Sequence, residues 1–493
     1  MKPSAFLPLL FSLVLPLPAQ PAAHSAERIP NILLITADDL SADSLGAYGC
    51  KVKGITPHLD ELAAQGMRFG HAHVNIAVCQ PSRQSILTGM YPHRNGGEGF
   101  EPINGDVRSL TQWLTYRGYL NGILGKEKHL QPEEKFRWDY LAGEAALADG
   151  AGIGRSVEKY HSHAKKFMEE AVAAGKPFFL MANMHDPHRP FAGSEQELNS
   201  WGDDLPKFTR RITEDEIEVP GFLPDLPEIR KEIAEYHTSV HRCDQAVGAV
   251  LRALRETGQE ENTLVMFLSD NGIAVPFAKS NCYLQSTKTP WIVRWPGKVK
   301  AGEVDEEHVI SGIDYMPTVL DAIGLGNQPG MDGTSFLPVL KGEKRPQREY
   351  AFTEYHRPYG NQCYPMRAVQ GKRYGYLVNF WAGRTPPMRM ESLSGRTWKA
   401  MQEAAKTDSE IAARVKLFER RTLEEFFDFE KDPDALNNLI DSPEHREEIG
   451  KLRAALAERM KVTKDPALEA FLGRDDPAKL DAFMEEQKAR ARP

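Results

Sequence analysis

Short apolar segments alternate with helical segments over the first 345 residues of this chain. Residues 31–36, 177–184 and 263–268 are apolar runs of strand length. Between them, residues 157–173 have the amphipathic pattern of a helix, and residues 229–257 form a long helical stretch. This alternation predicts an α/β domain in which helices flank a large, mainly parallel sheet. We expect further elements at 57–65, 82–90, 110–119 and 313–323 (helices) and at 122–125 (a short strand).

The pattern changes after about residue 345. The expected elements there are strands at 350–353, 366–369 and 374–379 and a closing helix at 445–460. No internal repeat or low-complexity linker separates the two parts. We therefore predict a catalytic domain over residues 27–345 and a smaller C-terminal α+β unit with an antiparallel sheet over residues 346–493, packed as one body.

The first 26 residues have the features of a secretory signal peptide. Lys2 precedes the apolar run Phe6–Leu15, and small residues follow between Ala19 and Ala26. This pattern predicts a signal peptide at residues 1–26 and export to the periplasm or out of the cell. An uncleaved N-terminal anchor is the alternative. No later apolar run is long enough to span a membrane.

Charge and cysteine content narrow the class of partner and of metal. The chain has 61 lysine and arginine residues against 69 aspartate and glutamate residues, which argues against nucleic-acid binding. A local cationic cluster could still hold an anionic substrate. The five cysteines include no pair with zinc-ligand spacing, and an odd number in an exported protein leaves at least one unpaired or chemically special. We expect Cys79 to be that residue.

Polar side chains follow four of the predicted strands. In chain order they are Asp38 and Asp39, Lys126 and His129, His185, and Asp270 and Asn271. The carboxyl ends of parallel strands share one edge of an open sheet, and ligands bind beyond that edge. A single aspartate or asparagine there is often only a cap or a turn residue. Four strand ends together predict a site.

Four of these residues carry oxygen ligands: Asp38, Asp39, Asp270 and Asn271. Carboxylate and amide oxygens suit a hard divalent cation, Ca²⁺ or Mg²⁺. Adjacent buried carboxylates repel each other, and a bound cation removes that cost. These residues are therefore candidate metal ligands.

The segment Cys79-Gln80-Pro81-Ser82-Arg83 places a thiol where a helix should begin. Backbone N–H groups and the helix dipole favour an anion at that position, and Arg83 adds a positive charge one turn later. The cations that could complete the site are Lys126, His129, His185 and Lys279. Together with a divalent metal, they predict a site for a tetrahedral oxyanion, sulfate or phosphate. In His185-Asp186-Pro187-His188, we expect His185 to face the site and His188 to support it.

These motifs resemble those of the type I sulfatases of the alkaline phosphatase superfamily, from residue 31 to about residue 439. The segments that carry the resemblance are 37–39, 79–83 with 87–89, 125–129, 185–188, 269–272, 427–433 and 438–439. The resemblance implies that a maturation enzyme converts Cys79 to Cα-formylglycine, whose hydrate is the nucleophile. It also implies one Ca²⁺ ion, bound by Asp38, Asp39, Asp270, Asn271 and the modified residue 79.

The resemblance further implies roles for the remaining site residues. Arg83 would stabilise the hydrate, and Lys126, His185 and Lys279 would neutralise charge on the sulfuryl oxygens. His129 or His185 would protonate the leaving group. Lys126 and His129 are three residues apart where the family usually has two, so Lys128 is a rival for Lys126.

Within the family, segments 179–189, 269–273 and 364–370 resemble the heparan N-sulfatases, or sulfamidases. The implied substrate is a sulfated oligosaccharide with an N-sulfated terminal glucosamine. Lys279 stands where a sulfamidase would have arginine and O-sulfatases commonly have lysine, so an O-sulfated polysaccharide is the alternative. Phosphate or phosphonate ester hydrolysis and a non-catalytic glycan-binding role are further alternatives.

The C-terminal unit is expected to help recognise the sugar, as it does in the family. The candidate contacts are Glu354, His356, Arg357 and Arg367. Their alternative role is to form salt bridges between the two units. Nothing in the sequence indicates the oligomeric state.

Overall fold

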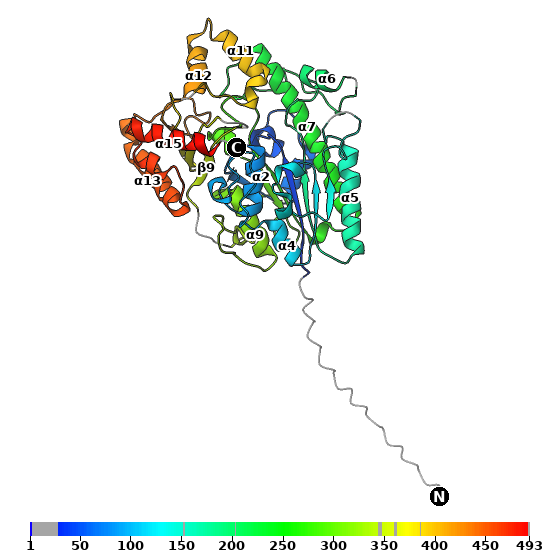
Figure 1. Ribbon diagram of the computed structural model, residues 1–493. Coiled ribbons are helices and arrows are strands. Elements are labelled where there is room, and N and C mark those ends of the chain that lie inside the picture. Colours follow the sequence, from blue (N-terminus) through cyan, green and yellow to red (C-terminus); the bar gives the residue numbers. More distant parts are fainter. Residues whose placement is uncertain are drawn as a thin grey trace.

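An eight-stranded, mostly parallel sheet lies at the centre of the protein, with strand order β4-β3-β5-β1-β6-β7-β2-β8 (Figure 1). The strands are β1 (Asn31–Ala37), β2 (Met67–His73), β3 (Leu120–Leu124), β4 (Tyr140–Ala142), β5 (Phe178–Asn183), β6 (Thr263–Ser269), β7 (Trp291–Arg294) and β8 (Glu303–Ser311). Strand β1 runs parallel to both β5 and β6, and β3 runs parallel to β5. Only β7 is antiparallel to its neighbours. The predicted α/β fold is confirmed.

The coordinates are a computed structural model that describes residues 1, 28–150, 153–202, 204–343, 348–358, 362–384 and 386–491. Apart from Met1, the predicted signal peptide lies outside these ranges, and so does the predicted boundary between residues 345 and 346. All five cysteines lie inside them, and none forms a disulfide.

Helices cover both faces of the large sheet, because successive side chains of each strand point to opposite faces. Leu33 and Ile35 of β1 pack with one set of helices, α1 (Pro57–Ala64), α5 (Val157–Ala173) and α7 (Pro227–Glu256). Ile32 and Leu34 pack with the other set, α2 (Cys79–Thr88), α4 (Leu110–Tyr116) and α9 (Tyr315–Ala322). The middle of this central strand, residues 32–35, is therefore apolar, and all seven residues of the strand are buried.

The second unit is built on an antiparallel sheet of order β12-β11-β10-β9. Its elements are β9 (Ala351–Tyr355), β10 (Met366–Gln370), β11 (Tyr374–Asn379), α11 (Arg396–Ala404), α12 (Ser409–Arg420), β12 (Glu424–Asp428), α13 (Arg446–Thr463), α14 (Leu468–Leu472) and α15 (Pro477–Arg490). Its buried side chains belong to the same hydrophobic cluster as those of α1, α5 and α7. The backbone N–H of Glu354 also donates to the carbonyl of Asn75 at 2.8 Å. The two units thus pack as one body.

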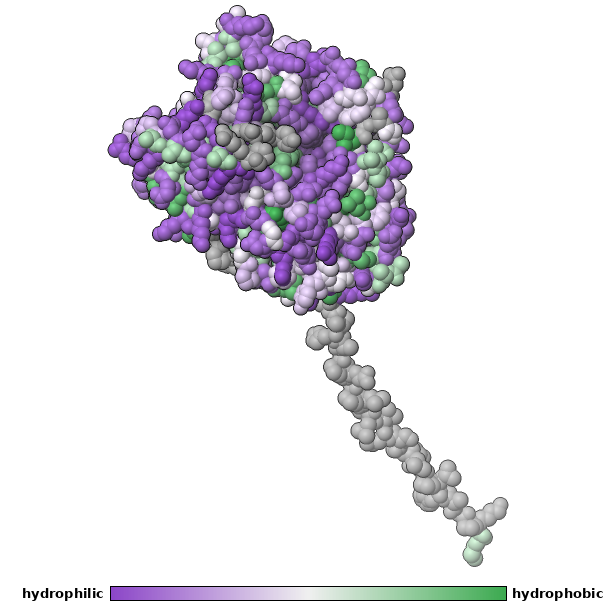
Figure 2. All heavy atoms as spheres, in the orientation of Figure 1, coloured by the Kyte–Doolittle hydropathy of each residue, from purple (hydrophilic) through white to green (hydrophobic). Residues whose placement is uncertain are grey.

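The surface is largely polar. The face in Figure 2 is mostly hydrophilic, with hydrophobic residues scattered among polar ones. Across the described ranges, no helix combines the length and the apolar composition that crossing a membrane requires.

Two differences from the sequence prediction have clear causes. Helix α2 begins at Cys79 rather than at Ser82, because Pro81 fits the first turn of a helix, where its missing N–H has no partner to lose. Strands β2 and β8 were not predicted. Gly70 and alternating polar residues dilute the apolar signal of β2, and most side chains of β8 lie partly or fully exposed.

A buried ionic cluster holds the loop that follows β5. Arg242 of α7 donates to both carboxylate oxygens of Asp186, at 2.7 and 2.9 Å, and to Glu197 at 3.0 Å. Arg155 lies 2.9 Å from Asp186 and donates to the carbonyl of His188 at 2.6 Å. All four charged side chains are buried, so each depends on its partners for compensation.

We predict that Arg242→Ala lowers the free energy of unfolding by about 3 kcal/mol or more, because the substitution leaves Asp186 and Glu197 without their main partner in a buried site. Chemical denaturation monitored by circular dichroism measures the change. Arg252→Ala, at a half-exposed position of the same helix, should change stability by less than about 0.5 kcal/mol. Equal effects of the two variants would contradict the role assigned to the cluster.

Candidate active site

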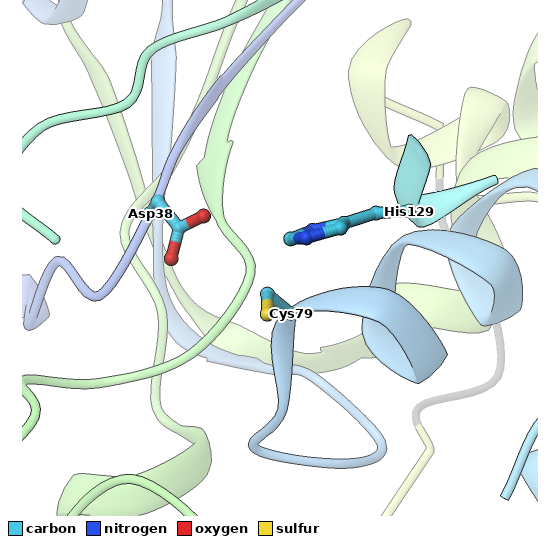
Figure 3. A group of neighbouring side chains, drawn as sticks. All are labelled: Asp38, Cys79 and His129. Carbon is cyan, nitrogen blue, oxygen red and sulfur yellow. The ribbon is translucent and has the colours of Figure 1, made fainter. Parts of the chain in front are cut away.

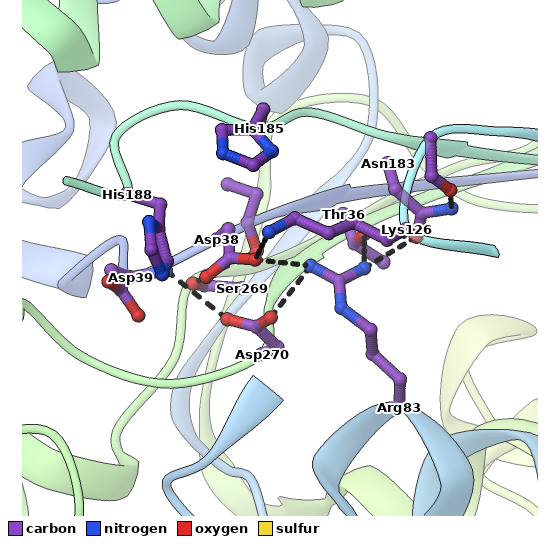
Figure 4. Close-up of polar contacts among 12 residues, drawn as sticks. Thr36, Asp38, Asp39, Arg83, Lys126, Asn183, His185, His188, Ser269 and Asp270 are labelled. Carbon is purple, nitrogen blue, oxygen red and sulfur yellow. Dashed lines mark hydrogen bonds and ion pairs between the residues drawn. The ribbon is translucent and has the colours of Figure 1, made fainter. Parts of the chain in front are cut away.

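Four neighbouring parallel strands deliver polar side chains to one edge of the sheet (Figure 4). Asp38 and Asp39 follow β1, Lys126 follows β3, His185 follows β5, and Asp270 and Asn271 follow β6. Strands β3, β5, β1 and β6 are consecutive in the sheet, so their carboxyl ends are adjacent. The structure therefore brings together the strand-end residues that the sequence singled out.

Cys79 faces this group from the first residue of α2. Its Sγ atom, a carboxylate oxygen of Asp38 and a ring nitrogen of His129 all lie within 4.8 Å of one another (Figure 3). The thiol is only 4% exposed. Burial, together with the charge of Asp38, raises the pKa of Cys79 to about 12. An unmodified thiol would therefore be protonated at neutral pH and a weak nucleophile.

Arg83 lies one turn further along α2 and is fully buried. Its guanidinium donates to Thr36 at 2.6 Å and to Asn183 at 2.5 Å, and it lies 2.7 Å from a carboxylate oxygen of Asp270. Asn183 ends β5 and also accepts from Thr36 at 2.7 Å. Sequence reasoning missed Thr36 and Asn183, although a polar residue that closes an apolar strand at the predicted edge was an available signal.

The oxygen atoms at the strand ends fit a hard cation. Asp38, Asp39 and Asp270 are fully buried. Burial, reinforced by the charge of Asp38, raises the pKa of Asp270 to about 7. The Oδ1 atoms of Asp38 and Asn271 are buried and have no hydrogen-bond partner in the described part of the chain. Two buried oxygens without hydrogen-bond donors beside three carboxylates are compatible with binding of Ca²⁺ or Mg²⁺, both of which prefer oxygen ligands.

Lysine side chains balance part of this negative charge. Lys126 is buried, and its Nζ atom lies 2.7 Å from Asp38. Lys279 Nζ lies 2.8 Å from Asp39 and 3.0 Å from Glu391. Lys128, the rival of Lys126, is exposed. Lys126 and Asp39 both adopt positive φ angles, 56° and 67°, which non-glycine residues seldom do outside functional sites and turns.

Three histidines surround the carboxylates. His185 is buried, and neither of its ring nitrogens has a hydrogen-bond partner among the described residues. Burial, reinforced by Lys126, holds the pKa of His185 well below its usual range and lowers the pKa of His129 to about 2, so both rings are neutral. His188 was expected only to support His185. Instead it also reaches the site, with a ring nitrogen within 4.8 Å of carboxylate oxygens of Asp38 and Asp39.

The predicted sugar-contacting residues form a separate buried network. Glu354 lies 2.6 Å from the ring of His93 and 3.1 Å from that of His356. Arg367 pairs with both oxygens of Asp465, at 2.6 and 2.9 Å. Of these contacts, the one from Glu354 to His93 joins the two units and matches the alternative role. The pairing of Arg367 with Asp465 lies inside the second unit.

Arg357 is connected to the thiol-bearing helix through Glu101. It donates to Glu98 at 2.9 Å and to Glu101 at 2.8 Å. The carbonyl of Glu101 in turn accepts from the side chain of Gln80, next to Cys79. Contact of any of these residues with a sugar stays a prediction.

Proteins of known family resemble this chain along most of its length. The family profile described as Sulfatase matches residues 30–325, and the profile described as N-sulphoglucosamine sulphohydrolase, C-terminal, matches residues 274–386. Human N-sulphoglucosamine sulphohydrolase is 32% identical over 468 residues, which cover 89% of this chain and 91% of the human protein. An ulvan-active sulfatase of Formosa agariphila is 27% identical over 90% of this chain and 82% of that protein.

A solved structure has the same fold. It is that of a protein in complex with its substrate D-glucosamine-2-N,6-O-disulfate. The TM-score is 0.66 with 20% sequence identity, over 89% of this chain and 99% of the other. The likeness confirms the alkaline-phosphatase-like fold expected from the sequence.

We predict that Lys126→Ala lowers kcat/KM for sulfate release by roughly a hundredfold or more, the usual cost of removing one donor that faces developing negative charge. Lys128→Ala, which removes an exposed lysine of the same loop, should change kcat/KM by less than about threefold. Steady-state kinetics of the two purified variants makes the comparison. The reverse order of effects would reassign the site to Lys128.

Proposed function

The chain belongs to the sulfatase family, and on that basis we propose that it hydrolyses the N-sulfate of a terminal glucosamine in heparan or heparin fragments. The observation that carries this choice of substrate is the similarity to N-sulphoglucosamine sulphohydrolases, which extends through residues 274–386 and so includes Lys279 and most of the second sheet. The second candidate is O-sulfate hydrolysis on another polysaccharide, favoured by the ulvan-active relative and by lysine rather than arginine at position 279.

Residue 79 is the proposed nucleophile after conversion to Cα-formylglycine by a maturation enzyme. The aldehyde, when hydrated, supplies a hydroxyl for attack on sulfur and a second hydroxyl for the release of sulfate. Three features support this assignment: the motif from Cys79 to Arg83, the position at the start of α2, and a pKa that keeps the unmodified thiol protonated. Arg83, held by Thr36 and Asn183, points its charge at this position.

One Ca²⁺ ion is the proposed metal, held by Asp38, Asp39, Asp270, Asn271 and the modified residue 79. When bound, the cation would reduce the repulsion among the three carboxylates and polarise the sulfuryl group. The buried Oδ1 atoms of Asp38 and Asn271, which lack donors, support this ligand set.

The remaining cations bind and orient the sulfuryl oxygens. Lys126 lies beside Asp38, and Lys279 lies beside Asp39. From these positions their ammonium groups can donate to an anion that enters the site. Their carboxylate partners hold both side chains in place before the substrate arrives, so little reorganisation is needed on binding.

A histidine protonates the departing nitrogen or oxygen. His185 suits this role because its ring is buried near Lys126 and neither ring nitrogen has a hydrogen-bond partner in the described ranges, although Nδ1 lies 3.9 Å from Glu144. His129, within 4.8 Å of the thiol, is the alternative proton donor. Because a neutral imidazole that lost its N–H proton would become an imidazolate, the ring first accepts a proton, from the attacking hydroxyl or from solvent, and then gives it to the leaving group as an imidazolium.

Export through the N-terminal signal peptide is part of the same proposal. The sulfated oligosaccharide and the maturation enzyme are the proposed partners, and the acidic balance of charge gives no support for nucleic acid.

We predict that the purified protein releases sulfate from N-sulfoglucosamine at least tenfold faster than from glucosamine 6-O-sulfate at equal concentration. Ion chromatography of released sulfate measures both rates. Cys79→Ala is the matched control and should release none, and mass spectrometry of the peptide that carries residue 79 verifies its conversion. Faster release from the O-sulfated sugar would favour O-sulfate hydrolysis over N-sulfate hydrolysis as the function.

We predict that Ca²⁺ raises the thermal midpoint of the metal-stripped protein by about 3 °C or more, because binding to the folded state alone stabilises it. Differential scanning fluorimetry with and without a chelator measures this shift. Asp39→Asn should reduce it, whereas Asp481→Asn, an exposed position far along the chain, should leave it unchanged. If Asp39→Asn shows the full rise in thermal midpoint on adding Ca²⁺, the metal binds at another site.

A further inference from the structure

One carboxylate at the site comes from the C-terminal unit and was absent from the sequence prediction. Glu391 lies in a short turn, Glu391–Ser394, that precedes α11. Its Oε2 atom is 3.0 Å from Lys279, and its Oε1 atom is 3.3 Å from the ring of His188. The side chain is 41% exposed, unlike the buried aspartates. Glu391 therefore stands where the site opens to solvent.

The backbone around Glu391 is fixed to the large domain. Glu232 of α7 accepts hydrogen bonds from the backbone N–H groups of Arg396 and Thr397, at 2.9 and 2.7 Å, and pairs with Arg189 at 2.7 Å. A Cβ atom at Gly395 would lie 2.6 Å from the side chains of both Arg189 and Glu232, so a larger residue would have to displace this ion pair. The turn that carries Glu391 is thus held in place before any ligand binds.

Neither partner of Glu391 needs it for charge compensation or for position. Lys279 is already paired with Asp39 at 2.8 Å. The other ring nitrogen of His188 lies 2.7 Å from the carbonyl of Arg189, which orients the ring. A carboxylate beside the cations of an anion site also weakens anion binding by repulsion. A half-exposed glutamate at this position therefore calls for a role beyond holding Lys279.

We propose that Glu391 is a specificity-determining residue that accepts a hydrogen bond from a hydroxyl or N–H group of the sugar next to the scissile bond. An ionised carboxylate is a pure acceptor with about four lone-pair sites, so it has acceptor capacity left after its contacts with Lys279 and His188. It favours a sugar with free donors there and disfavours one with a second anionic group. This inference rests on the proposed function, since it assigns a contact for the sulfated sugar.

The test separates sugar recognition from anion binding. The full-length Cys79→Ala protein, loaded with Ca²⁺, does not turn over, so isothermal titration calorimetry gives dissociation constants for N-sulfoglucosamine and for inorganic sulfate. Adding Glu391→Gln should weaken N-sulfoglucosamine binding about tenfold or more, the usual cost of losing a hydrogen bond to a charged group. The same substitution should leave sulfate binding unchanged or tighter, because a negative charge has been removed. Glu391→Asp keeps the charge but shortens the side chain. Its dissociation constant for N-sulfoglucosamine should fall between that of the parent and that of Glu391→Gln.

A loss of affinity that is not specific to the sugar overturns the proposal. If Glu391→Gln weakens both ligands equally, Glu391 acts only through Lys279 and His188. Glu403→Gln, at an exposed position of α11, is the control and should leave both constants unchanged. If the parent protein binds an O-sulfated sugar but not N-sulfoglucosamine, the proposed function fails, and the comparison is made with that sugar instead. The effect of Glu391→Gln on the dissociation constant of that sugar, compared with its effect on that of inorganic sulfate, then still decides the role of Glu391.

Discussion

The structure depends on the compensation of three buried aspartates at the carboxyl ends of β1 and β6. Asp38, Asp39 and Asp270 are fully buried, and three buried carboxylates in contact would not remain ionised without opposite charge. That charge comes from three cations on three separate elements: Arg83 on α2, Lys126 after β3 and Lys279 after β6. The arrangement ties four regions of the chain to one point and requires the sheet order that makes β3, β5, β1 and β6 neighbours.

The sequence predicted the parts of this site that local pattern encodes. Asp38, His185 and Asp270 each follow an apolar strand, and parallel strands share an edge, so their convergence could be foreseen. The orientation of His188 could not, because it depends on the loop fixed by Arg155, which precedes α5, and by Arg242 of α7. Glu391 was missed for a stronger reason: about 110 residues separate it from Lys279, and no local pattern marks a lone exposed glutamate as part of a site.

The same limit applies to the fold. Buried strands such as β1 and β5 are largely apolar and were predicted within one or two residues. Strand β8 was missed because six of its nine residues are partly or fully exposed, and four of these six are charged. Its pairing with β2 supplies backbone hydrogen bonds, and the side-chain pattern of β8 does not indicate this pairing. The apolar pattern therefore predicted central strands such as β1 and β5, whereas the edge strand β8 forms through its pairing with β2.

The contacts at the site give the two units different roles in binding the substrate. The aspartates, Arg83 and Lys126 all belong to the large domain, and its cations would bind the oxygens of any tetrahedral sulfuryl group, whatever that group is attached to. A choice among sulfated substrates must come from groups that reach past the sulfuryl oxygens. Glu391 from the second unit reaches the rim of the site, and the ion pairs from Glu354 and Arg357 to the large domain keep that unit in a fixed position. Substrate selectivity can therefore change through the second unit while the charge balance that holds the site together stays intact.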